Sequence, residues 1–372
     1  MRTFLQTHVT LMIVSCSLLG GCKTDPPLAP ASVHKDREFT EFFRRTSGWT
    51  AGDGAFSVPL SDGRVLWLFG DSYIDHFDTQ TGTVPCLFQV RNAAMLQARR
   101  DDRQVSTLVG QSPAGKSLFV HPTDAKLWFW PECGFQRGDD VFVYLIALER
   151  TPAGGMLGFK VVAHFWARMK FPEMVVTEYI ALPDFSGIDF GRGFISEGRY
   201  TYAFGGKQEG LGSKIYVARF NTGNPERDWN FWDGQTWNSG PTKAAIIGRG
   251  ASTSVHVCKV RNKFLLTTSA FSVGCDQGKD IFVATGSKPT GPFSALKKIF
   301  SIDDFVEGHL PFFYLPVAHP EFINEKNELL ITYSINGYEP CVPSCVNGRM
   351  NPDYYRPRAI RVPLSMLDPT LH

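Results

Sequence analysis

Two aspartates stand near the ends of one short stretch, GWTAGDGAFSVPLSDGRVLWLFGDSY, which covers residues 48–73. Asp53 and Asp71 each lie beside a glycine and are flanked by strand-like sequence. Two carboxylates held close together titrate as a pair, so that one is an acid and the other a base at the same pH. Glycoside hydrolysis uses such a pair: one donates a proton to the departing oxygen, and the other activates water or attacks the sugar.

The turn between the two aspartates decides whether their side chains meet. The segment SDG at residues 61–63 suits a three-residue hairpin loop whose glycine takes the left-handed position. Leu60 would then face Arg64, and counting outward places Asp53 opposite Asp71, with Cβ atoms ~5 Å apart on one face. A two-residue turn would send them to opposite faces. The alternative is that each aspartate only marks a turn or a strand end.

The same strand, turn and strand pattern recurs along the chain, which indicates a repetitive β fold. Turns fall near positions 62, 138, 197, 261 and 325, a spacing of roughly 60–75 residues that suits one four-stranded sheet each. Thirty Phe, 8 Trp and 35 Gly fit an aromatic, turn-rich β protein. We predict an all-β, five-bladed β-propeller, with a β-sandwich as the alternative. Outer strands are expected at 214–220, 280–286 and 358–364, and a short helix within 36–46.

Charge and motifs exclude several other classes of protein. The chain has 38 basic and 36 acidic residues, too even a balance for a nucleic-acid-binding surface. It contains no P-loop, no GxSxG motif, no dinucleotide-binding loop, no HExxH and no CxxC pair. We expect no cofactor, while a structural cation in the central channel of the propeller stays open.

The N-terminus has the features of an export signal. An apolar run precedes Leu-Gly-Gly-Cys22, which resembles a bacterial lipobox, with an ordinary signal peptide as the alternative. We expect a lipoprotein signal over residues 1–22, a tether and short N-terminal segment over 23–46, one propeller domain over 47–366 and a tail over 367–372. Lipidation of Cys22 would anchor the protein to the cell envelope, at the outer membrane rather than the inner membrane.

Six further cysteines could form disulfides in an oxidising compartment: Cys86, Cys133, Cys258, Cys275, Cys341 and Cys345. Cys341 and Cys345 could close a small ring, and Cys258 and Cys275 flank one predicted hairpin. The sequence does not choose among the possible pairings.

The stretch at 48–73 resembles the first blade of a propeller family known as domain of unknown function 4185. Weaker resemblances follow in order at FWPECGF (129–135), IYVARF (215–220), SVHVCKV (254–260), TGPFSALKKIF (290–300), AHPEF (318–322) and YYRPRAIRV (354–362). Members of that family are linked to endo-acting D-arabinan hydrolysis, and their fold is related to glycoside hydrolase family 43. The resemblance implies that Asp53 and Asp71 are catalytic and that the substrate is an arabinan-type furanosyl polymer. FWPECGF departs from the family, with Glu132 and Cys133 where glycine and aspartate are expected.

Other residues expected on the inner strands are candidates for binding the substrate. Trp130 could stack on a sugar face, and His256 and His319 could bind hydroxyl groups or tune the carboxylates. For the histidines a buried structural role is the alternative. The candidates are Trp130, Glu132, Asn92, Arg249, His256, His319 and Glu321.

Together these features predict an exported, lipid-anchored glycoside hydrolase that acts on a polysaccharide or oligosaccharide. A non-catalytic propeller that binds glycans is the main alternative, and a protein-interaction scaffold is another. We expect a monomer and no nucleic-acid partner.

Overall fold

The computed structural model describes residues 32–110, 117–152, 154, 158–338, 340–342 and 345–371. The expected signal peptide, Cys22 and the first part of the tether lie outside the described residues. In the described part of the chain, no helix combines the length and the apolar character needed to cross a membrane.

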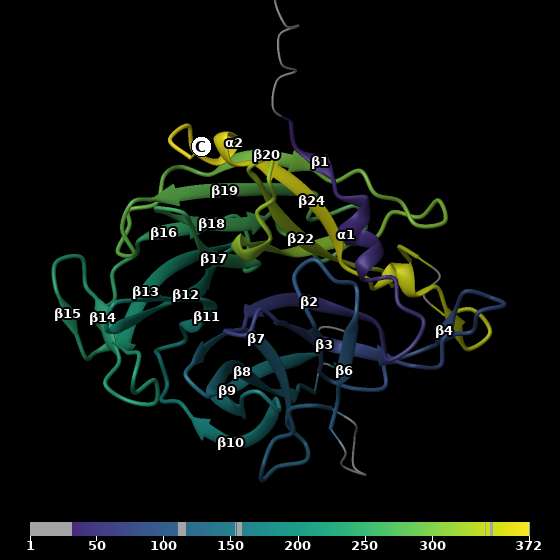
Figure 1. Cartoon of the computed structure of the whole chain (residues 1–372), viewed down its shortest axis with the longest axis horizontal. Helices are drawn as coiled ribbons and strands as arrows, with labels where there is room; N and C mark the ends of the chain where they lie inside the picture. The colour runs from purple at the N-terminus through teal and green to yellow at the C-terminus, as the bar shows by residue number, and fades with distance from the viewer. Residues whose placement is uncertain are drawn as a thin grey trace, which may run out of the picture. The chain divides into compact units, whose positions relative to one another are not determined.

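Five antiparallel sheets follow one another around a ring (Figure 1). The innermost strands of neighbouring sheets contact each other all the way round. The prediction of a five-bladed β-propeller is therefore confirmed, and the β-sandwich is excluded.

Blades one and two each have four strands that pair in chain order. Blade one consists of β2 (Trp49–Pro59), β3 (Val65–Ile74), β5 (Ala93–Gln97) and β6 (Val105–Leu108). Blade two consists of β7 (Trp128–Arg137), β8 (Asp140–Arg150), β9 (Phe159–Lys170) and β10 (Val175–Ala181).

Blades three and four continue the ring. Blade three consists of β11 (Asp189–Glu197), β12 (Tyr200–Glu209), β13 (Gly212–Asn221), β14 (Asn230–Trp232), β15 (Trp237–Asn238) and β16 (Gly248–Gly250), which pairs with β13. Blade four consists of β17 (Val255–Val260), β18 (Lys263–Ser269), β19 (Asp280–Gly286) and β20 (Lys297–Ser301).

Blade five closes the ring with a strand from the other end of the domain. Its strands are β21 (Phe312–His319), β22 (Glu328–Asn336), β24 (Arg358–Pro363) and β1 (His34–Lys35). His34 pairs with Arg361, and Lys35 with Ile360. Residues that the sequence analysis assigned to the tether thus supply the outer edge of the last blade.

Short elements complete the fold. The helices are α1 (Arg37–Phe42) and α2 (Leu364–Leu367), and the 3₁₀ turns are η1 (Pro241–Lys243), η2 (Pro320–Phe322) and η3 (Pro352–Tyr354). A two-stranded sheet joins β4 (Val84–Pro85) to β23 (Arg349–Met350). The expected N-terminal helix is α1, which begins where the Asp36 side chain accepts a hydrogen bond from the Phe39 backbone N–H at 2.8 Å.

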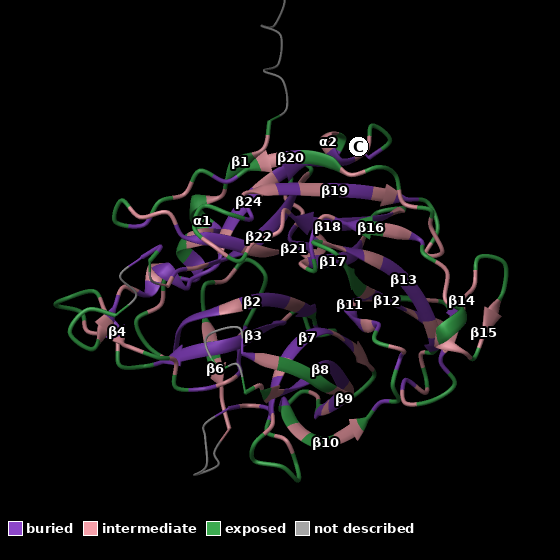
Figure 2. Ribbon diagram, turned by 180° about the vertical axis from the view of Figure 1, so that it is seen from behind, coloured by how far each residue is buried: buried purple, intermediate pink, exposed green. Residues whose placement is uncertain are grey.

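Apolar packing between adjacent blades holds the ring together. Figure 2 shows buried residues running through the strands, while exposed residues gather in loops and at outer edges. Phe39 and Phe42 of α1 pack against the fully buried Trp67 of blade one, with ring centroids 5.7 Å apart in both pairs. Burial of each such side chain stabilises the fold by roughly 1.5–3 kcal/mol.

Candidate active site

The hairpin of β2 and β3 has the predicted turn. The Leu60 N–H donates to the Arg64 carbonyl at 2.9 Å, and Gly63 has a φ of 90°. From this turn the strands pair in the predicted register up to Phe56 opposite Leu68. The loop length that the SDG segment indicated is therefore confirmed.

Two bulges then interrupt the hairpin close to the aspartates. Ala55, with a φ of 52°, is an extra residue on β2, and the pairing shifts again between Gly52 and Gly54. The two shifts cancel, so that Gly52 lies opposite Ser72, in the register that the turn predicted. Asp53 therefore faces the bulged pair Gly70 and Asp71 rather than one partner residue. Bulges of this kind re-aim side chains and are frequent beside active sites.

Gly70 leaves the space that the Asp53 side chain occupies. A Cβ atom at residue 70 would lie 2.6 Å from Asp53 Oδ1, which is too close for any real side chain. The carboxylate of Asp53 therefore rests against the backbone immediately before Asp71. This contact brings the two acids to one place in the first blade.

Asp71 is buried and has two donors around it. Only 8% of the residue is exposed. The Trp130 indole N–H donates to Asp71 Oδ1 at 3.1 Å, and Arg91 Nη1 lies 3.4 Å from both carboxylate oxygens. Burial and the negative charge of Asp53 raise the pKa of Asp71 to about 7, although Arg91 and Trp130 oppose the shift.

Asp53 has hydroxyl groups as partners instead of a cation. The Tyr314 hydroxyl donates to Asp53 Oδ2 at 2.7 Å. Burial raises the pKa of Asp53, while hydrogen bonds from Tyr314 and Tyr355 favour its ionised form. Because the charge of Asp53 is one cause of the raised pKa of Asp71, the two carboxyl groups titrate as an interacting pair.

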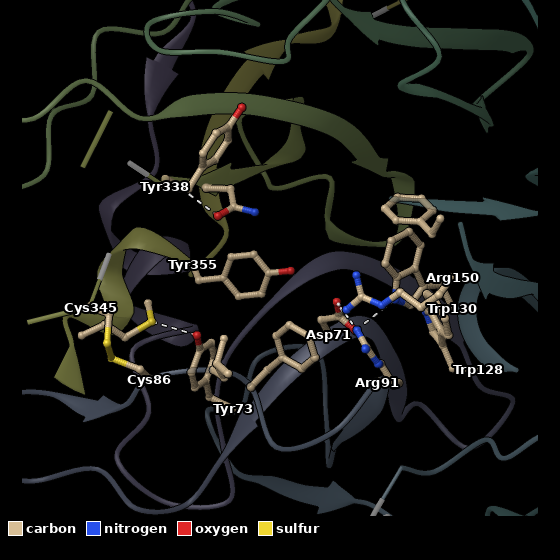
Figure 3. A pocket seen from close by; sticks show the side chains of 16 residues that line it. Asp71, Tyr73, Cys86, Arg91, Trp128, Trp130, Arg150, Tyr338, Cys345 and Tyr355 are labelled. Atoms are coloured by element: carbon tan, nitrogen blue, oxygen red, sulfur yellow. Dashed lines mark hydrogen bonds and ion pairs between the residues drawn. A yellow bond between two sulfur atoms is a disulfide. The ribbon is translucent and has the colours of Figure 1, made fainter. Parts of the chain in front are cut away.

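Asp71 lies on the wall of a cavity of about 410 Å³ between blades one, two and five. Figure 3 shows Asp71, Arg91, Arg150, Trp128 and Trp130 on one side, the Cys86–Cys345 disulfide on the other and Tyr355 between them. Asp53 is partly exposed and adjoins the wall residues Asp71 and Tyr355. Aromatic walls with a few polar groups are typical of ligand sites.

A second group of charges lies at the bulge of β7 and in the first half of β11. Arg192 Nη1 is 2.7 Å from Glu132 Oε1, and its Nη2 is 2.5 Å from Asp189 Oδ2. Glu132 is 4% exposed, and burial together with Asp189 raises its pKa well above the usual value in spite of Arg192. Arg192 is thus shared by Glu132 and Asp189. A Cβ atom at Gly191 would lie 1.8 Å from Glu132 Oε2, so glycine is required there too.

Asp189 and Arg192, but not Glu132, line a separate cavity of about 430 Å³. Its other walls come from β9, the loop before β11, the end of β12 and the loop before β17. None of the wall residues is Phe, Tyr or Trp. The two cavities therefore differ in the surface that they offer to a ligand.

Two further candidates of the sequence analysis lie away from both cavities. Asn92 is fully buried, and its amide nitrogen donates to the Phe119 and Phe129 carbonyls, both at 2.9 Å. Arg249 is exposed and pairs with Glu209 at 2.5 Å on blade three. The structure gives both side chains structural partners and places neither at Asp71.

The two candidate histidines are buried and neutral. Burial lowers the pKa of His256 to about 3, and its Nδ1 accepts the Ala318 backbone N–H at 3.2 Å. His319 Nδ1 lies 2.6 Å from Ser57 Oγ, and its Nε2 lies 2.8 Å from Thr332 Oγ1. Burial lowers the pKa of His319 well below its usual value.

Glu321 belongs to the same buried network as His319 and not to the Asp71 cavity. The Ser57 hydroxyl donates to Glu321, and burial raises the pKa of Glu321 to about 7. Tyr314, which contacts Asp53, is near the start of β21, whereas His319 ends it, five residues and roughly 15 Å further on. Asp53, Asp71 and Trp130 are thus the predicted site residues that the fold brings together, while Glu132 lies in the Arg192 cluster.

Three residues that contact the aspartates were not singled out from the sequence: Arg91, Tyr314 and Tyr355. Arg91 directly precedes Asn92 and approaches Asp71, whereas Asn92 turns into the core. The sequence did contain a signal for Asp189 and Arg192. Asp189 lies about as many residues before the turn between β11 and β12 as Asp53 lies before Gly63.

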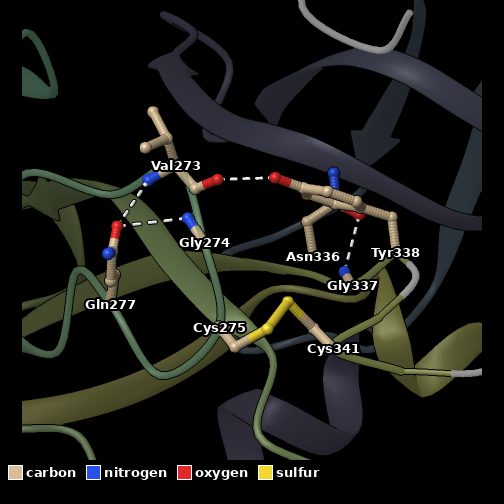
Figure 4. The surroundings of a disulfide bond; sticks show 8 residues. All are labelled: Val273, Gly274, Cys275, Gln277, Asn336, Gly337, Tyr338 and Cys341. Atoms are coloured by element: carbon tan, nitrogen blue, oxygen red, sulfur yellow. Dashed lines mark hydrogen bonds between the residues drawn. A yellow bond between two sulfur atoms is a disulfide. The ribbon is translucent and has the colours of Figure 1, made fainter.

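The cysteine pairs differ from the expectation of a small ring. Cys345 bonds to Cys86 of blade one, and Cys341 bonds to Cys275 of blade four. Both bonds tie the loop after β22 to a neighbouring blade. Figure 4 shows the second bond, beside which the Tyr338 hydroxyl donates to the Val273 carbonyl at 2.5 Å. Of the described cysteines, Cys133 and Cys258 are buried thiols without a disulfide, and no group of three His, Cys, Asp or Glu in that part of the chain could hold a metal ion.

The chain belongs to the family described as domain of unknown function 5005 (DUF5005), whose model matches residues 36–364. This is not the DUF4185 family that the first blade resembles, and membership of DUF4185 is not confirmed. No curated protein is similar to this chain in sequence.

Solved structures share the propeller. A "putative hydrolase" from Bacteroides ovatus ATCC 8483 has a TM-score of 0.72 and 19% identity, over 93% of this chain and 95% of its own. At this identity the similarity shows the fold alone. An exo-beta-1,3-galactanase from Phanerochaete chrysosporium has a TM-score of 0.47 and 11% identity, over 86% of this chain and 63% of its own. The catalytic domain of a GH62 alpha-L-arabinofuranosidase from Coprinopsis cinerea has a TM-score of 0.45 and 13% identity, over 86% and 92%. Scores below 0.5 say nothing about the chemistry of this chain.

Proposed function

We propose that this protein is a glycoside hydrolase whose acid and base are Asp71 and Asp53. The observation that supports this most is a coupled carboxylate pair, one member of which titrates near pH 7 on the wall of an aromatic cavity. A general acid works best when its pKa lies near the working pH. Aromatic rings such as that of Trp130 suit the apolar faces of sugars.

In the proposed reaction, protonated Asp71 donates its proton to the glycosidic oxygen as the bond from that oxygen to the anomeric carbon breaks. Trp130 donates to Asp71 Oδ1 at 3.1 Å, whereas the contact of Oδ2 with Arg91 Nη1 is 3.4 Å long, so we place the donated proton on Oδ2. Ionised Asp53 either takes a proton from the attacking water or bonds to the anomeric carbon itself. The anomer of the first product distinguishes these two routes.

The substrate and the location of the protein are parts of this proposal. An arabinan-type polymer remains the substrate that the resemblance to DUF4185 suggests. We also propose that the chain is exported and anchored through Cys22, which globomycin-sensitive processing in a bacterial host would test.

The direct test is release of reducing ends from a panel of glycans that includes arabinan. We expect activity in the wild type, a loss of at least about 10²-fold in Asp53→Asn and Asp71→Asn, and no change in Asp62→Asn. Asp62 is a matched control because it lies in the turn of the same hairpin and contacts Arg64, far from the cavity. Binding without turnover in the wild type would instead support a glycan-binding protein.

A further inference from the structure

The walls of the Asp71 cavity carry an excess of positive charge. Asp71, Arg91 and Arg150 are the charged residues that line it. Because the pKa of Asp71 is about 7, this acid carries only part of a negative charge at neutral pH. Ionised Asp53 adjoins the wall and offsets one of the two arginines, so the net charge of this cavity lies between zero and one positive unit.

A second hollow extends this positive surface. A cavity of about 590 Å³ shares Leu87, Phe88, Arg91, Trp128 and Arg150 with the first one. Its remaining walls include Lys126 and His121 and no acidic residue. The two hollows form a groove in which Arg91, Arg150 and Lys126 outnumber the two carboxylates, Asp71 on the wall and Asp53 beside it.

Aromatic rings hold Arg91 in a geometry that suits an anion. Its guanidinium lies 4.8 Å from the Phe88 ring and 4.6 Å from the Trp128 ring, and Arg150 lies 5.8 Å from the same Trp128 ring. Only Nη1 of Arg91 contacts Asp71. Its Nε and Nη2 have no acceptor among the residues that the structure describes. A guanidinium that contacts two aromatic rings and has further N–H donors is suited to bind a carboxylate or a sulfate through two hydrogen bonds.

The Arg192 cavity does not share the positive charge of the groove. Its charged walls are Asp184, Asp189 and Arg192, with His164 beside them, and Arg192 is already engaged by two acids. Two acids and one arginine give that cavity a negative balance. Binding of a neutral glycan would require neither the positive charge of the groove nor the negative charge of the Arg192 cavity.

We propose that the groove binds an anionic sugar unit, whose carboxylate or sulfate contacts Arg91 and Arg150 while its ring lies along Trp128 and Trp130. The location of the unit next to Asp71 rests on the proposed function, whereas the binding itself does not. The substrate class that this binding implies is an acidic polysaccharide, either a polyuronate or a sulfated glycan, and it replaces the arabinan-type polymer that the resemblance to DUF4185 suggests.

Binding of matched acidic and neutral glycans to the full-length protein tests this proposal. The probes are polygalacturonate with its carboxyl-reduced form, and a carrageenan with its desulfated form, followed by affinity electrophoresis and calorimetry. We expect at least one acidic probe to bind at least about tenfold more tightly than its neutral partner, as two charge-assisted hydrogen bonds allow. Which probe binds identifies a carboxylate or a sulfate as the anion.

Three variants and a change of salt concentration test the proposal further. We expect Arg150→Gln to weaken binding of the acidic probe about tenfold, Lys126→Gln to weaken it less, and Lys160→Gln to leave it unchanged. Lys160 is the matched control because it pairs with Glu149 on the same hairpin but lines neither cavity. Melting temperatures show whether Arg150→Gln is folded. Raising the salt from 50 to 500 mM should weaken acidic binding only, since the Debye length falls several-fold.

The possible results separate this inference from the proposed function. Acidic binding without hydrolysis would support the inference and contradict the hydrolase. Hydrolysis of a neutral glycan, with no preference for its acidic counterpart and no salt effect, would contradict the inference and leave the hydrolase standing. Equal binding by the wild type and a folded Arg150→Gln would also contradict the inference.

Discussion

Two groups of the same composition, two acids and one arginine, lie in this propeller, one in blade one and the other between blades two and three. In the first, Arg91 stands 3.4 Å from Asp71, and Asp53 accepts tyrosine hydroxyls. In the second, Arg192 contacts Glu132 at 2.7 Å and Asp189 at 2.5 Å. The acids of both groups lie at β-bulges, between β2 and β3 in the first group and in β7 and β11 in the second.

The difference lies in contact distance and access. A loosely held arginine leaves Asp71 with a pKa of about 7 on an aromatic wall, where it can exchange a proton with a ligand. In the second group, the charge of Arg192 is neutralised by ion pairs within the protein. The pKa of Glu132 is raised as well, but Glu132 lines neither the Asp71 cavity nor the Arg192 cavity. A raised pKa is therefore not enough to define a catalytic group. The acid must also titrate near the working pH and face the substrate.

The largest expected effect separates the acids of the two groups. We expect Asp71→Asn to lower kcat on the polysaccharide by on the order of 10³-fold, because it removes the donated proton. Asp189→Asn should keep kcat within about threefold of the wild type and lower the melting temperature instead. Steady-state kinetics and thermal melts measure both. Equal losses of kcat in the two variants would mean that the second group also takes part in the chemistry.

The next effect concerns the two arginines and stability. Replacing one partner of a buried ion pair leaves the other charge uncompensated, so Arg192→Gln should lower the free energy of unfolding by about 3–5 kcal/mol. Arg91→Gln should cost less than about 1 kcal/mol, since its contact with Asp71 is long and it lies near the surface. Urea denaturation of both variants tests this order. A larger loss in Arg91→Gln would invert the comparison.

Two glycines provide a smaller but specific contrast. Gly70→Ala adds a methyl group 2.6 Å from Asp53 Oδ1, which must displace the carboxylate; we expect kcat to fall about 10²-fold. Gly191→Ala would push on Glu132 Oε2 and should destabilise the fold while sparing kcat in the molecules that remain folded. Activity per folded molecule, corrected by the fraction folded at the assay temperature, distinguishes the two.

The smallest effect is a shift of a pH profile. Asp71 acts as an acid, so activity should fall as pH rises through about 7. Arg91 lowers the pKa of Asp71, and its removal in Arg91→Gln should move this alkaline limb upward by as much as about one pH unit. The dependence of kcat/KM on pH measures the limb. A downward shift, or none, would show that another group controls it.

Sequence reasoning placed the ring and one hairpin because their signals are local. The SDG turn determined the register of β2 and β3, and the five turns marked the blades. The bulges at Ala55 and Gly70 left no local signal, since neither residue type requires one. The two register shifts cancel, so Asp53 and Asp71 still lie next to each other, as the turn predicted.

The spacing of residues along the sequence could not predict contacts between distant segments. Tyr314 and Tyr355 come to Asp53 from blade five, and Cys345 pairs with a cysteine 259 residues away. Arg91 was missed in favour of Asn92 by one position, because no strand pattern there showed which of the two faced the core. Such contacts depend on how blades close into a ring, which local sequence does not encode.

The central claim is that Asp71 supplies the proton and Asp53 the base. It is tested most directly by comparing the polysaccharide with a 2,4-dinitrophenyl glycoside of the sugar that the glycan panel identifies, because that leaving group departs without protonation. We predict that Asp71→Asn loses on the order of 10³-fold in kcat/KM on the polysaccharide but less than about tenfold on the aryl glycoside, whereas Asp53→Asn loses activity on both. Equal losses of Asp71→Asn on the two substrates would contradict the account.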